Sequence, residues 1–447
     1  MLGSLIFDQN ALATHPAVIT RNASVSWAEL RDSACEFADN CKSLANRRVG
    51  VFFSPNAGSY ALLAALDRLA VDAFLFDSRL PLPDVLGAAK ELKLAVLISA
   101  EDDRSTRLIT HELPDGASWS GASTVTILTS GSTGKPKAAR HSWESLCRPV
   151  RRKSSLSRPR WLLTYRPHLY AGLQVMLQCF ADQGTLVIAD SGMDPRATVQ
   201  LMAGAGVHYA SATPSFWRRL LIFSDRELLR KIPILQITLG GEVVDQSILD
   251  QLRYYFPETR LAHIYATTEL GRCFSVTDGI AGFPPSFLNR VLPDGIEMKV
   301  VDGELLVRSA NSMQMYDPYS PGLQAGKDWF PTGDLVEVQA ERVFFVGRKS
   351  DLINVAGSKV YPIEVERTIR SIPGVSDVRV YGKASSIAGE LVACEIVPVS
   401  GVSSDTLRET VVRVCQSQLA TYQQPRMIKF VERIDLSAAG KILRSKG

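Results

Sequence analysis

The sequence lacks a long apolar run, and it has no clear excess of either charge. No apolar stretch in its 447 residues approaches the ~18–20 residues that a membrane-spanning helix needs. Its start, Met1 to Asp8, has neither the basic residues nor the long apolar stretch of a signal peptide. Lys and Arg number 50 against 46 Asp and Glu, and the densest basic run, 148–153, contains no aromatic residue. We therefore expect a cytoplasmic protein with no membrane span and no nucleic-acid partner.

Cysteine is also sparse, and the spacing of the cysteines excludes two kinds of structural cross-link. The seven cysteines are scattered through the chain and never form a Cys-x-x-Cys pair. This pattern predicts reduced thiols, with neither a zinc site nor a disulfide framework. The sequence contains no internal repeat and no low-complexity segment.

The chain is long enough for two or three lobes, and most of it alternates between strand and helix patterns. Apolar runs at 48–53, 73–76 and 94–98 are separated by helical stretches, which is typical of βαβ units with buried parallel strands. The alternation resumes at 161–164, 185–188 and 235–239. Beyond Pro293 short strands follow, with Asp302-Gly303 as a hairpin signal, and from about Ser350 a small α+β unit is expected with helices at 362–369 and 406–419.

A glycine-rich loop follows the β-branched strand pattern of 124–128. Its backbone N–H groups, hydroxyls and ammonium groups suit a polyphosphate. The spacing differs from that of the Gly-x-x-x-x-Gly-Lys-Ser/Thr loop, and Pro136 disfavours a helix at this point. The alternative is a flexible surface turn. The candidate phosphate-binding residues are Thr129, Ser130, Gly131, Ser132, Thr133, Gly134, Lys135 and Lys137.

With the motifs described next, this loop resembles that of the adenylate-forming enzymes, which include acyl-CoA synthetases, nonribosomal-peptide adenylation domains and firefly luciferase. The resemblance runs from about Val25 to the C-terminus. It implies an α/β fold with a large N-terminal domain, 1–348, made of βαβ-type subdomains and a β-rich subdomain. It also implies a small, mobile α+β C-terminal domain, 349–447. ATP, Mg²⁺ and coenzyme A, or the phosphopantetheine arm of a carrier protein, are the implied ligands.

The segment Tyr265-Ala266-Thr267-Thr268-Glu269 is the second match. A carboxylate beside a hydroxyl suits Mg²⁺ bridging phosphate oxygens. By resemblance Tyr265 lines the adenine site, Thr268 contacts the α-phosphate, and Glu269 holds the metal. The family usually has glycine at the position of Ala266. A methyl group there can narrow the acyl pocket, so the motif does not fix the size of the substrate. A helix cap with a buried tyrosine is the structural alternative.

Two further segments complete the expected nucleotide site. Thr332-Gly333-Asp334 and the later Arg348 offer a carboxylate and a guanidinium that can hold a ribose diol. The loop Gly240, Gly241 and Glu242 resembles the family's loop that lines both the adenine and the acyl sites. Each segment alone is equally compatible with an ordinary turn.

The C-terminal matches concern catalysis. Ser350 occupies the family's hinge position, commonly Asp or Lys, and Gly357 is expected to border a tunnel for the thiol. Lys441, in a Gly-Lys pair, corresponds to the catalytic lysine, whose ammonium neutralises charge as two anions approach. The alternative for the segment that contains Ser350 and Gly357 is a plain interdomain linker. The alternative for Lys441 is a solvated residue of the C-terminal tail.

The acid itself is constrained by an absence. By resemblance, the segment 164–173 forms one wall of the acyl pocket, where amino-acid-activating relatives place an aspartate. No acidic residue lies between Arg160 and Phe180, so a substrate ammonium would lack a buried partner there. A non-amino acid, aryl or aliphatic, is therefore favoured. The candidate pocket residues, which are equally compatible with a core role, are His168, Tyr170, Gly172, Thr213 and Phe216.

These residues predict an AMP-forming acid–thiol ligase. It would convert a carboxylic acid and ATP to acyl-AMP and pyrophosphate, and then transfer the acyl group to the thiol of coenzyme A. Transfer to a carrier protein, as in a stand-alone amino-acid adenylating enzyme, is the alternative. A silent nucleotide-binding protein of this fold is a further alternative, although such a protein could have lost Lys441 or Glu269 and both are present. A luciferase-like oxygenase shares the same motifs.

Overall fold

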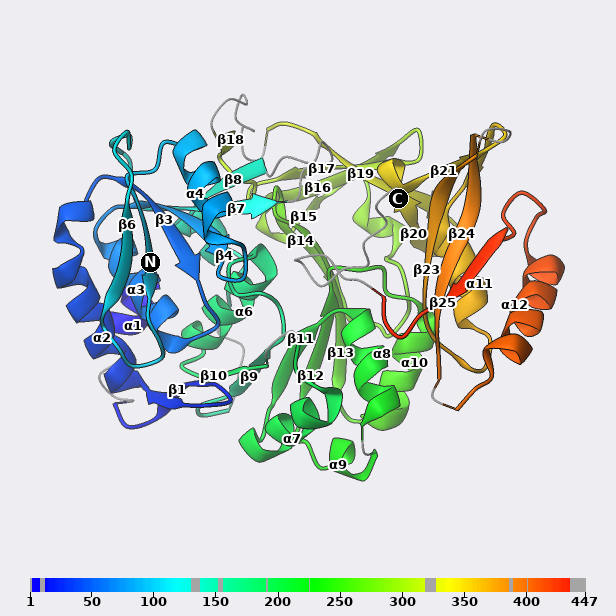
Figure 1. Cartoon of the computed structure of the whole chain (residues 1–447), viewed down its shortest axis with the longest axis horizontal. Helices are drawn as coiled ribbons and strands as arrows, with labels where there is room; N and C mark the ends of the chain where they lie inside the picture. The colour runs from blue at the N-terminus through cyan, green and yellow to red at the C-terminus, as the bar shows by residue number, and fades with distance from the viewer. Residues whose placement is uncertain are drawn as a thin grey trace.

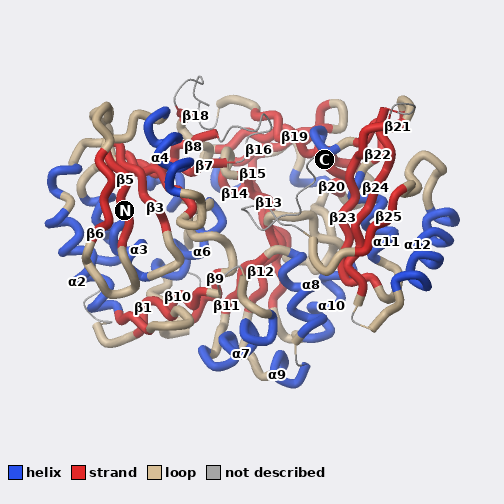
Figure 2. The backbone as a smooth tube through the Cα atoms, in the orientation of Figure 1, coloured by secondary structure: helices blue, strands red, loops and turns tan. Residues whose placement is uncertain are grey.

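The computed structural model describes residues 2–8, 13–129, 137–151, 156–189, 192–224, 226–317, 327–385, 389–399 and 401–434. Within these residues the chain forms four β-sheets, arranged from the N-terminal part at one end to the C-terminal part at the other (Figures 1 and 2). No helix in the described part of the chain is long and apolar enough to span a membrane.

The first sheet has seven strands in the order β18-β8-β7-β4-β3-β5-β6. Its central strands are parallel, and the expected βαβ units are present, with α3 (Ala57–Arg68) between β3 and β4 and α4 (Leu82–Glu91) between β4 and β5. The antiparallel strands β6, β8 and β18 complete both edges. The strands are β3 Arg48–Phe53, β4 Asp72–Asp77, β5 Val96–Ala100, β6 Leu108–Glu112, β7 Thr124–Thr129, β8 Lys137–Ser142 and β18 Met315–Asp317.

The second sheet has eight strands in the order β14-β13-β12-β11-β9-β10-β1-β2. All neighbours are parallel except the two outermost pairs. The strands are β1 Pro16–Ile19, β2 Ser24–Ser26, β9 Arg160–Leu163, β10 Thr185–Ile188, β11 Tyr209–Ala212, β12 Gln236–Gly240, β13 Arg260–Thr267 and β14 Gly271–Val276. The helices in this part are α5 Trp143–Cys147, α6 Tyr170–Ala181, α7 Pro195–Ala205, α8 Pro214–Phe223, α9 Arg226–Arg230 and α10 Gln246–Tyr255.

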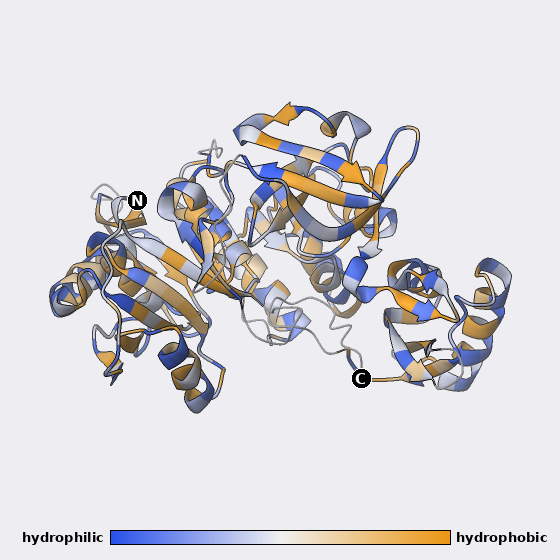
Figure 3. Cartoon of the chain, turned by 90° about the horizontal axis from the view of Figure 1, so that it is seen from above, coloured by the Kyte–Doolittle hydropathy of each residue, from blue (hydrophilic) through white to orange (hydrophobic). Residues whose placement is uncertain are grey.

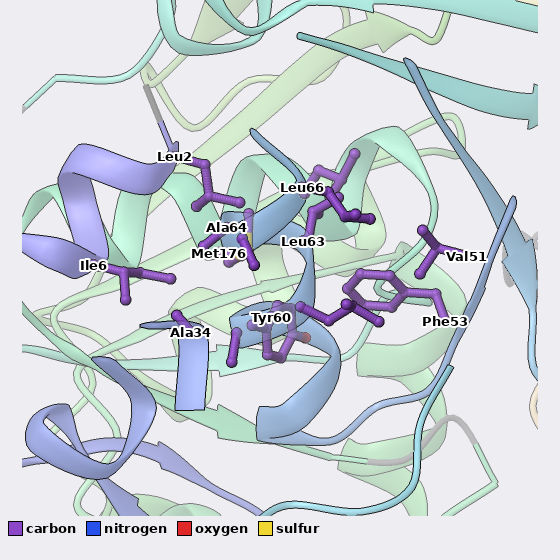
Figure 4. Close-up of a cluster of buried hydrophobic side chains, with 14 of the residues drawn as sticks. Leu2, Ile6, Ala34, Val51, Phe53, Tyr60, Leu63, Ala64, Leu66 and Met176 are labelled. Carbon is purple, nitrogen blue, oxygen red and sulfur yellow. The ribbon is translucent and has the colours of Figure 1, made fainter. Parts of the chain in front are cut away.

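These two sheets share one hydrophobic core. Every residue of α3 from Ala57 to Leu66 is buried, because its alanine- and leucine-rich surface meets apolar residues from both sheets. Tyr60 packs edge-on against Phe180 of α6, with ring centroids 6.1 Å apart. Figure 4 shows how side chains of α1 (Leu2–Phe7), α2 (Trp27–Asn40) and α6 converge on α3. The shared core fixes the two sheets relative to each other.

A five-stranded antiparallel sheet follows, in the order β15-β16-β17-β19-β20. The predicted hairpin is confirmed: β16 and β17 are joined at Asp302 and Gly303, whose φ angles of 49° and 78° suit a tight two-residue turn. The strands are β15 Val291–Leu292, β16 Ile296–Val301, β17 Glu304–Ser309, β19 Phe330–Val338 and β20 Val343–Arg348.

The last sheet, with α11 (Pro362–Arg370) and α12 (Ser404–Gln418), forms a unit with its own hydrophobic core. It lies at the end of the molecule opposite α1 and α2, a separation that is also visible from above (Figures 1 and 3). One of its contacts with the rest of the chain is that of Arg370 of α11 with Asp245, at 3.8 Å, and Asp245 also lies 2.6 Å from Arg218 of α8. The strands are β21 Ile353–Val355, β22 Ser358–Val360, β23 Val375–Ser385, β24 Gly389–Pro398 and β25 Met427–Phe430.

Candidate active site

A cleft of ≈ 1720 Å³ lies where β12 and β13 end, between the eight-stranded sheet, the five-stranded sheet and α11. The carboxyl ends of parallel strands are where open α/β sheets bind ligands. Most of the predicted nucleotide residues line this cleft. They are Lys137, Gly240, Gly241, Glu242, Tyr265, Ala266, Thr267, Thr268, Glu269, Asp334 and Arg348.

Asp334 and Arg348 face each other on the paired strands β19 and β20. The Arg348 Nε donates to Asp334 Oδ1 at 2.8 Å, and the hydroxyl of Tyr265 donates to Oδ2 at 2.6 Å. Burial, reinforced by the Asp334 carboxylate, raises the pKa of Tyr265, so its hydroxyl stays protonated and can donate. We call Tyr265, Asp334 and Arg348 the ribose triad, since their carboxylate, hydroxyl and guanidinium suit a vicinal diol.

Aromatic rings continue the wall beside this triad. The ring of Tyr265 lies 5.4 Å from that of Phe274 and 4.9 Å from that of Phe345. Both phenylalanines line the cleft. Such a wall is suited to a flat heterocyclic base. The sequence reasoning identified Tyr265 but missed Phe274 and Phe345, which only strand pairing brings beside it.

His141 links the glycine-rich region to the second motif. It lies on β8, is fully buried, and its Nε2 is 2.7 Å from the carbonyl oxygen of Thr268. Because a carbonyl can only accept, Nε2 carries the hydrogen. Burial lowers the pKa of His141 to about 4, so the ring is neutral near pH 7. This contact holds the backbone of Thr268, and no local sequence pattern indicated it.

Glu269 is positioned by β18, which pairs with β8. Its Oε1 accepts a hydrogen bond from the hydroxyl of Tyr316 at 2.9 Å, and its carbonyl accepts from the Met313 N–H at 2.7 Å. The Lys137 ammonium lies 5.2 Å from the centre of the Tyr316 ring. A carboxylate and a lysine thus border the same end of the cleft.

This end fits a magnesium ion that is held mainly by its substrate. Mg²⁺ is usually bound through one or two carboxylates plus phosphate oxygens and water. Across the described ranges no group of three or more His, Cys, Asp or Glu forms a self-sufficient metal site. Glu269, whose Oε1 accepts a hydrogen bond from Tyr316, is the carboxylate that would hold such an ion.

The Gly240-Gly241-Glu242 loop lines the cleft where β12 ends. The Gly240 carbonyl accepts from the hydroxyl of Tyr165 at 3.2 Å, and Gly241 has a φ of 86° that favours glycine. Glu242 Oε2 accepts from the backbone N–H of Ser215 at 3.0 Å, at the start of α8. Burial raises the pKa of Glu242. The cleft also extends between α6 and the eight-stranded sheet. Its lining there includes Gln174 and Gln178 of α6 and Trp161, Tyr209 and Thr238 of the sheet, and we call this part the acyl arm.

Four predicted pocket residues lie outside the lining of the cleft, and only Tyr170 of that set lines it. His168 is buried, and burial lowers its pKa to about 4. Gly172 is a packing position, since a Cβ there would lie 2.3 Å from the Arg166 carbonyl oxygen. Thr213 caps α8 by accepting from the Phe216 N–H, and Phe216 packs against Trp217. The expectation that these four residues line the acyl pocket stays a prediction.

The remaining predicted residues fall in four groups. Ser350 lies in a short 3-10 turn, Lys349–Asp351, and lines the cleft. Gly357 lies in the turn between β21 and β22 with a φ of 88°, away from the cleft lining. Thr129 ends β7, but its side chain is outside the description. The predicted positions Ser130, Gly131, Ser132, Thr133, Gly134, Lys135 and Lys441 lie outside the described residues.

Comparison with known protein families shows to which family the chain belongs. A model described as "AMP-binding enzyme" matches residues 7–317, and one described as "AMP-binding enzyme C-terminal domain" matches residues 364–441. The chain belongs to the AMP-binding enzyme family. The resemblance and the fold class expected from the motifs are thereby confirmed.

Several curated relatives of this AMP-binding enzyme carry the names of CoA ligases. The 2-succinylbenzoate–CoA ligase of Listeria innocua is 26% identical over 414 residues, covering 87% of this chain and 85% of the relative. The indoleacetate–CoA ligase of Aromatoleum aromaticum is 27% identical over 333 residues, covering 70% and 64%.

Solved structures share the fold. An anthranilate CoA ligase in complex with anthranoyl-AMP superposes with a TM-score of 0.80 at 17% identity, over 99% of this chain and 95% of the other. The o-succinylbenzoate CoA synthetase of Bacillus subtilis, in complex with its acyl-adenylate intermediate, gives a TM-score of 0.74 at 21% identity, over 99% and 96%. The arrangement of sheets in this AMP-binding enzyme is that of adenylate-forming enzymes.

Proposed function

We propose that this AMP-binding enzyme is an AMP-forming acid–thiol ligase that activates a non-amino carboxylic acid, aryl or aliphatic, and transfers it to coenzyme A. The observation that carries the proposal is the union of two features in one cleft. The ribose triad lies on one side, and the acyl arm lies on the other, where the lining residues of α6 and of β9, β11, β12, β13 and β14 include no Asp or Glu. CoA ligases among the named relatives support the same reaction class.

In the first half-reaction a carboxylate oxygen of the acid attacks the α-phosphorus of ATP, and pyrophosphate leaves. The enzyme needs no nucleophilic side chain, because placement and charge stabilisation lower the barrier. The ribose triad holds the sugar, and Thr268, with its backbone held by His141, lies where the α-phosphate is expected. Glu269 would hold a magnesium ion, which would supply neutralisation of the phosphate charge.

In the second half-reaction the thiolate sulfur of coenzyme A attacks the acyl carbon, and AMP leaves. We propose that residues 1–348 hold the substrates and that residues 349–447 rotate about Ser350 between the two steps. Lys441 then serves adenylation, and Gly357 borders the thiol in the second step. The separate core of the C-terminal unit and the position of Ser350 at the cleft support this division. The cytoplasm is the proposed compartment.

The test is a carboxylic-acid panel read by pyrophosphate release, with and without coenzyme A, and with a phosphopantetheinylated carrier protein. We expect non-amino acids to support release and acyl-CoA to form. Exchange supported only by amino acids, or thioester formed only on the carrier protein, would replace this proposal with the carrier-loading alternative. Products that require oxygen would instead indicate a luciferase-like reaction.

Lys441→Ala tests the catalytic lysine separately. Adenylate formation is expected to fall on the order of 100-fold or more, because lost electrostatic stabilisation of a reacting centre costs about 3–4 kcal/mol. ATP binding should persist. Lys429→Ala is a matched control, since Lys429 is an exposed lysine on β25 of the same unit. Equal adenylation by Lys441→Ala and wild type would remove Lys441 from the mechanism.

A further inference from the structure

The acyl arm has a wall whose residues are set by strand register. Trp161, Tyr209, Gln236 and Arg260 lie side by side on β9, β11, β12 and β13, and all four line the cleft. Because alternate residues of a strand share a face, the next positions along these strands line the same wall. From the row of Arg260 to Ala266 the wall extends about 20 Å, at ~3.3 Å per residue.

This wall is small and polar in the middle. Its central row consists of Ser211, Thr238 and Ala262, which are paired with one another in register. Gly240, Ile264 and Ser275 form the row nearer the nucleotide. The opposite wall includes Gln174 and Gln178 of α6. A plain hydrocarbon chain would meet many polar groups in such a slot, which is an unfavourable match.

The charged side chains that α6 and the strands of the eight-stranded sheet contribute to the lining are all positive. Among the described residues they are Arg260 at the outer row and Arg272 at the inner end. Arg272 lies on β14 opposite Ala266, directly beside the second motif. Its backbone N–H donates to the hydroxyl of Tyr170 at 3.1 Å, which fixes the strand against α6. The backbone that carries the Arg272 side chain is therefore held in place by Tyr170.

The guanidinium of Arg272 is only partly neutralised. Its Nη2 lies 3.1 Å from Asp294 Oδ2, and the same carboxylate lies 2.5 Å from Arg151 Nη2. Two guanidinium groups thus share one carboxylate, which leaves an excess of one positive charge. The Arg272 side chain is 25% exposed, and a guanidinium has five N–H donors. Donors remain to bind an anionic group inside the arm.

We propose that Arg272 is a specificity-determining residue that binds a second carboxylate of the substrate, so that the acid activated by this enzyme is a dicarboxylic acid. The proposal rests on the proposed function, because the reacting carboxylate occupies the nucleotide end of the same cleft. The second carboxylate of the substrate would neutralise the positive charge that remains when Arg151 and Arg272 share the single carboxylate of Asp294. A charged, bidentate partner suits the planar fork of arginine better than a neutral tail does.

The experiment compares aryl and alkyl dicarboxylic acids with their monomethyl esters, which keep the shape and remove the second charge. With wild-type enzyme, kcat/KM for pyrophosphate release is expected to be about 10–100-fold higher for the diacid of suitable length, since hydrogen bonds to charged groups contribute about 1.5–3 kcal/mol. The difference should lie mainly in KM, because this contact exists before and during the reaction.

Arg272→Met should abolish this preference, and Arg272→Lys should retain part of it. Arg260→Met is the matched variant, and it should keep the preference because Arg260 lies about 20 Å along the strand from Ala266. Thermal unfolding of each variant shows whether it is folded, and the wild-type preference is informative without any variant. Equal use of diacid and monoester by wild type, or a preference that survives Arg272→Met, would overturn the proposal. If no acid of either kind releases pyrophosphate, the proposed function itself fails.

Discussion

Lowering the pH should lower the free energy of unfolding by a predictable amount, because His141, which contacts Thr268, is buried as a neutral ring. The unfolded chain binds a proton at His141 with a pKa of 6.5, while burial lowers the folded pKa to about 4. Since the folded state disfavours the proton, the stability that neutral His141 gives is present above pH 6.5 and is lost as pH falls toward 4. At pH 5 the loss is about 2 kcal/mol, and the full loss is about 3 kcal/mol.

The perturbation that isolates this effect is His141→Gln, which removes the titrating ring and keeps an N–H donor. Urea unfolding is followed by tryptophan fluorescence between pH 7.5 and 5. All six tryptophans precede residue 330, so the signal reports on the part of the chain that contains His141. The variant's deficit relative to wild type should shrink by about 2 kcal/mol over this range. His168, whose pKa is also lowered to about 4, titrates in both proteins and cancels in the difference.

His111→Gln provides the control, since His111 is half-buried on the outer strand β6. Its pH profile should follow that of wild type. Parallel profiles for wild type and His141→Gln would refute the reasoning, because they would mean that the buried ring does not resist protonation. Greater stability of wild type at pH 5 than at pH 7.5 would have the same consequence.

Three further outcomes follow from contacts described above. Tyr316→Phe removes the hydrogen bond that orients Glu269, and the Mg²⁺ concentration for half-maximal pyrophosphate release should rise about tenfold. Asp334→Asn should weaken ATP binding on the order of tenfold, measured by calorimetry without acid, because Tyr265 and Arg348 lose a charged partner. Gly172→Ala places a Cβ 2.3 Å from a backbone oxygen and should destabilise the fold by about 1–3 kcal/mol in urea, whereas Gly87→Ala, with open space in α4, should not destabilise it.

The sequence predicted those parts of the fold that depend on local patterns. The apolar runs at 48–53 and 185–188 became β3 and β10, and the Asp302-Gly303 signal became a hairpin, because strand alternation and turn chemistry act over a few residues. The grouping of Asp334 with Arg348 was expected from resemblance, and strand pairing gives its physical reason.

What sequence reasoning missed depends on distant pairings. His141 and Tyr316 act on the second motif only because β8 and β18 lie side by side, and no local pattern marks such a pairing. The choice of acyl-pocket residues was limited for a different reason. Because α6 is buried on nearly every side, its hydrophobic pattern cannot tell Tyr170, which lines the cleft, from Gly172, which packs against Arg166.

The pairing of β18 with β8 also constrains the order in which the protein can be completed during synthesis. Arg140 and Met315, which are partners in this pair, are 175 residues apart in sequence. The strands β3, β4, β5 and β7 can therefore associate as soon as they leave the ribosome, but the edge beside Lys137 stays uncovered until residue 317 has been translated. Such a long-range closure is entropically slow. A nascent chain that stops at residue 300 should hold much of its first core and yet lack the tyrosine that orients Glu269, so competence for adenylation arises late in translation.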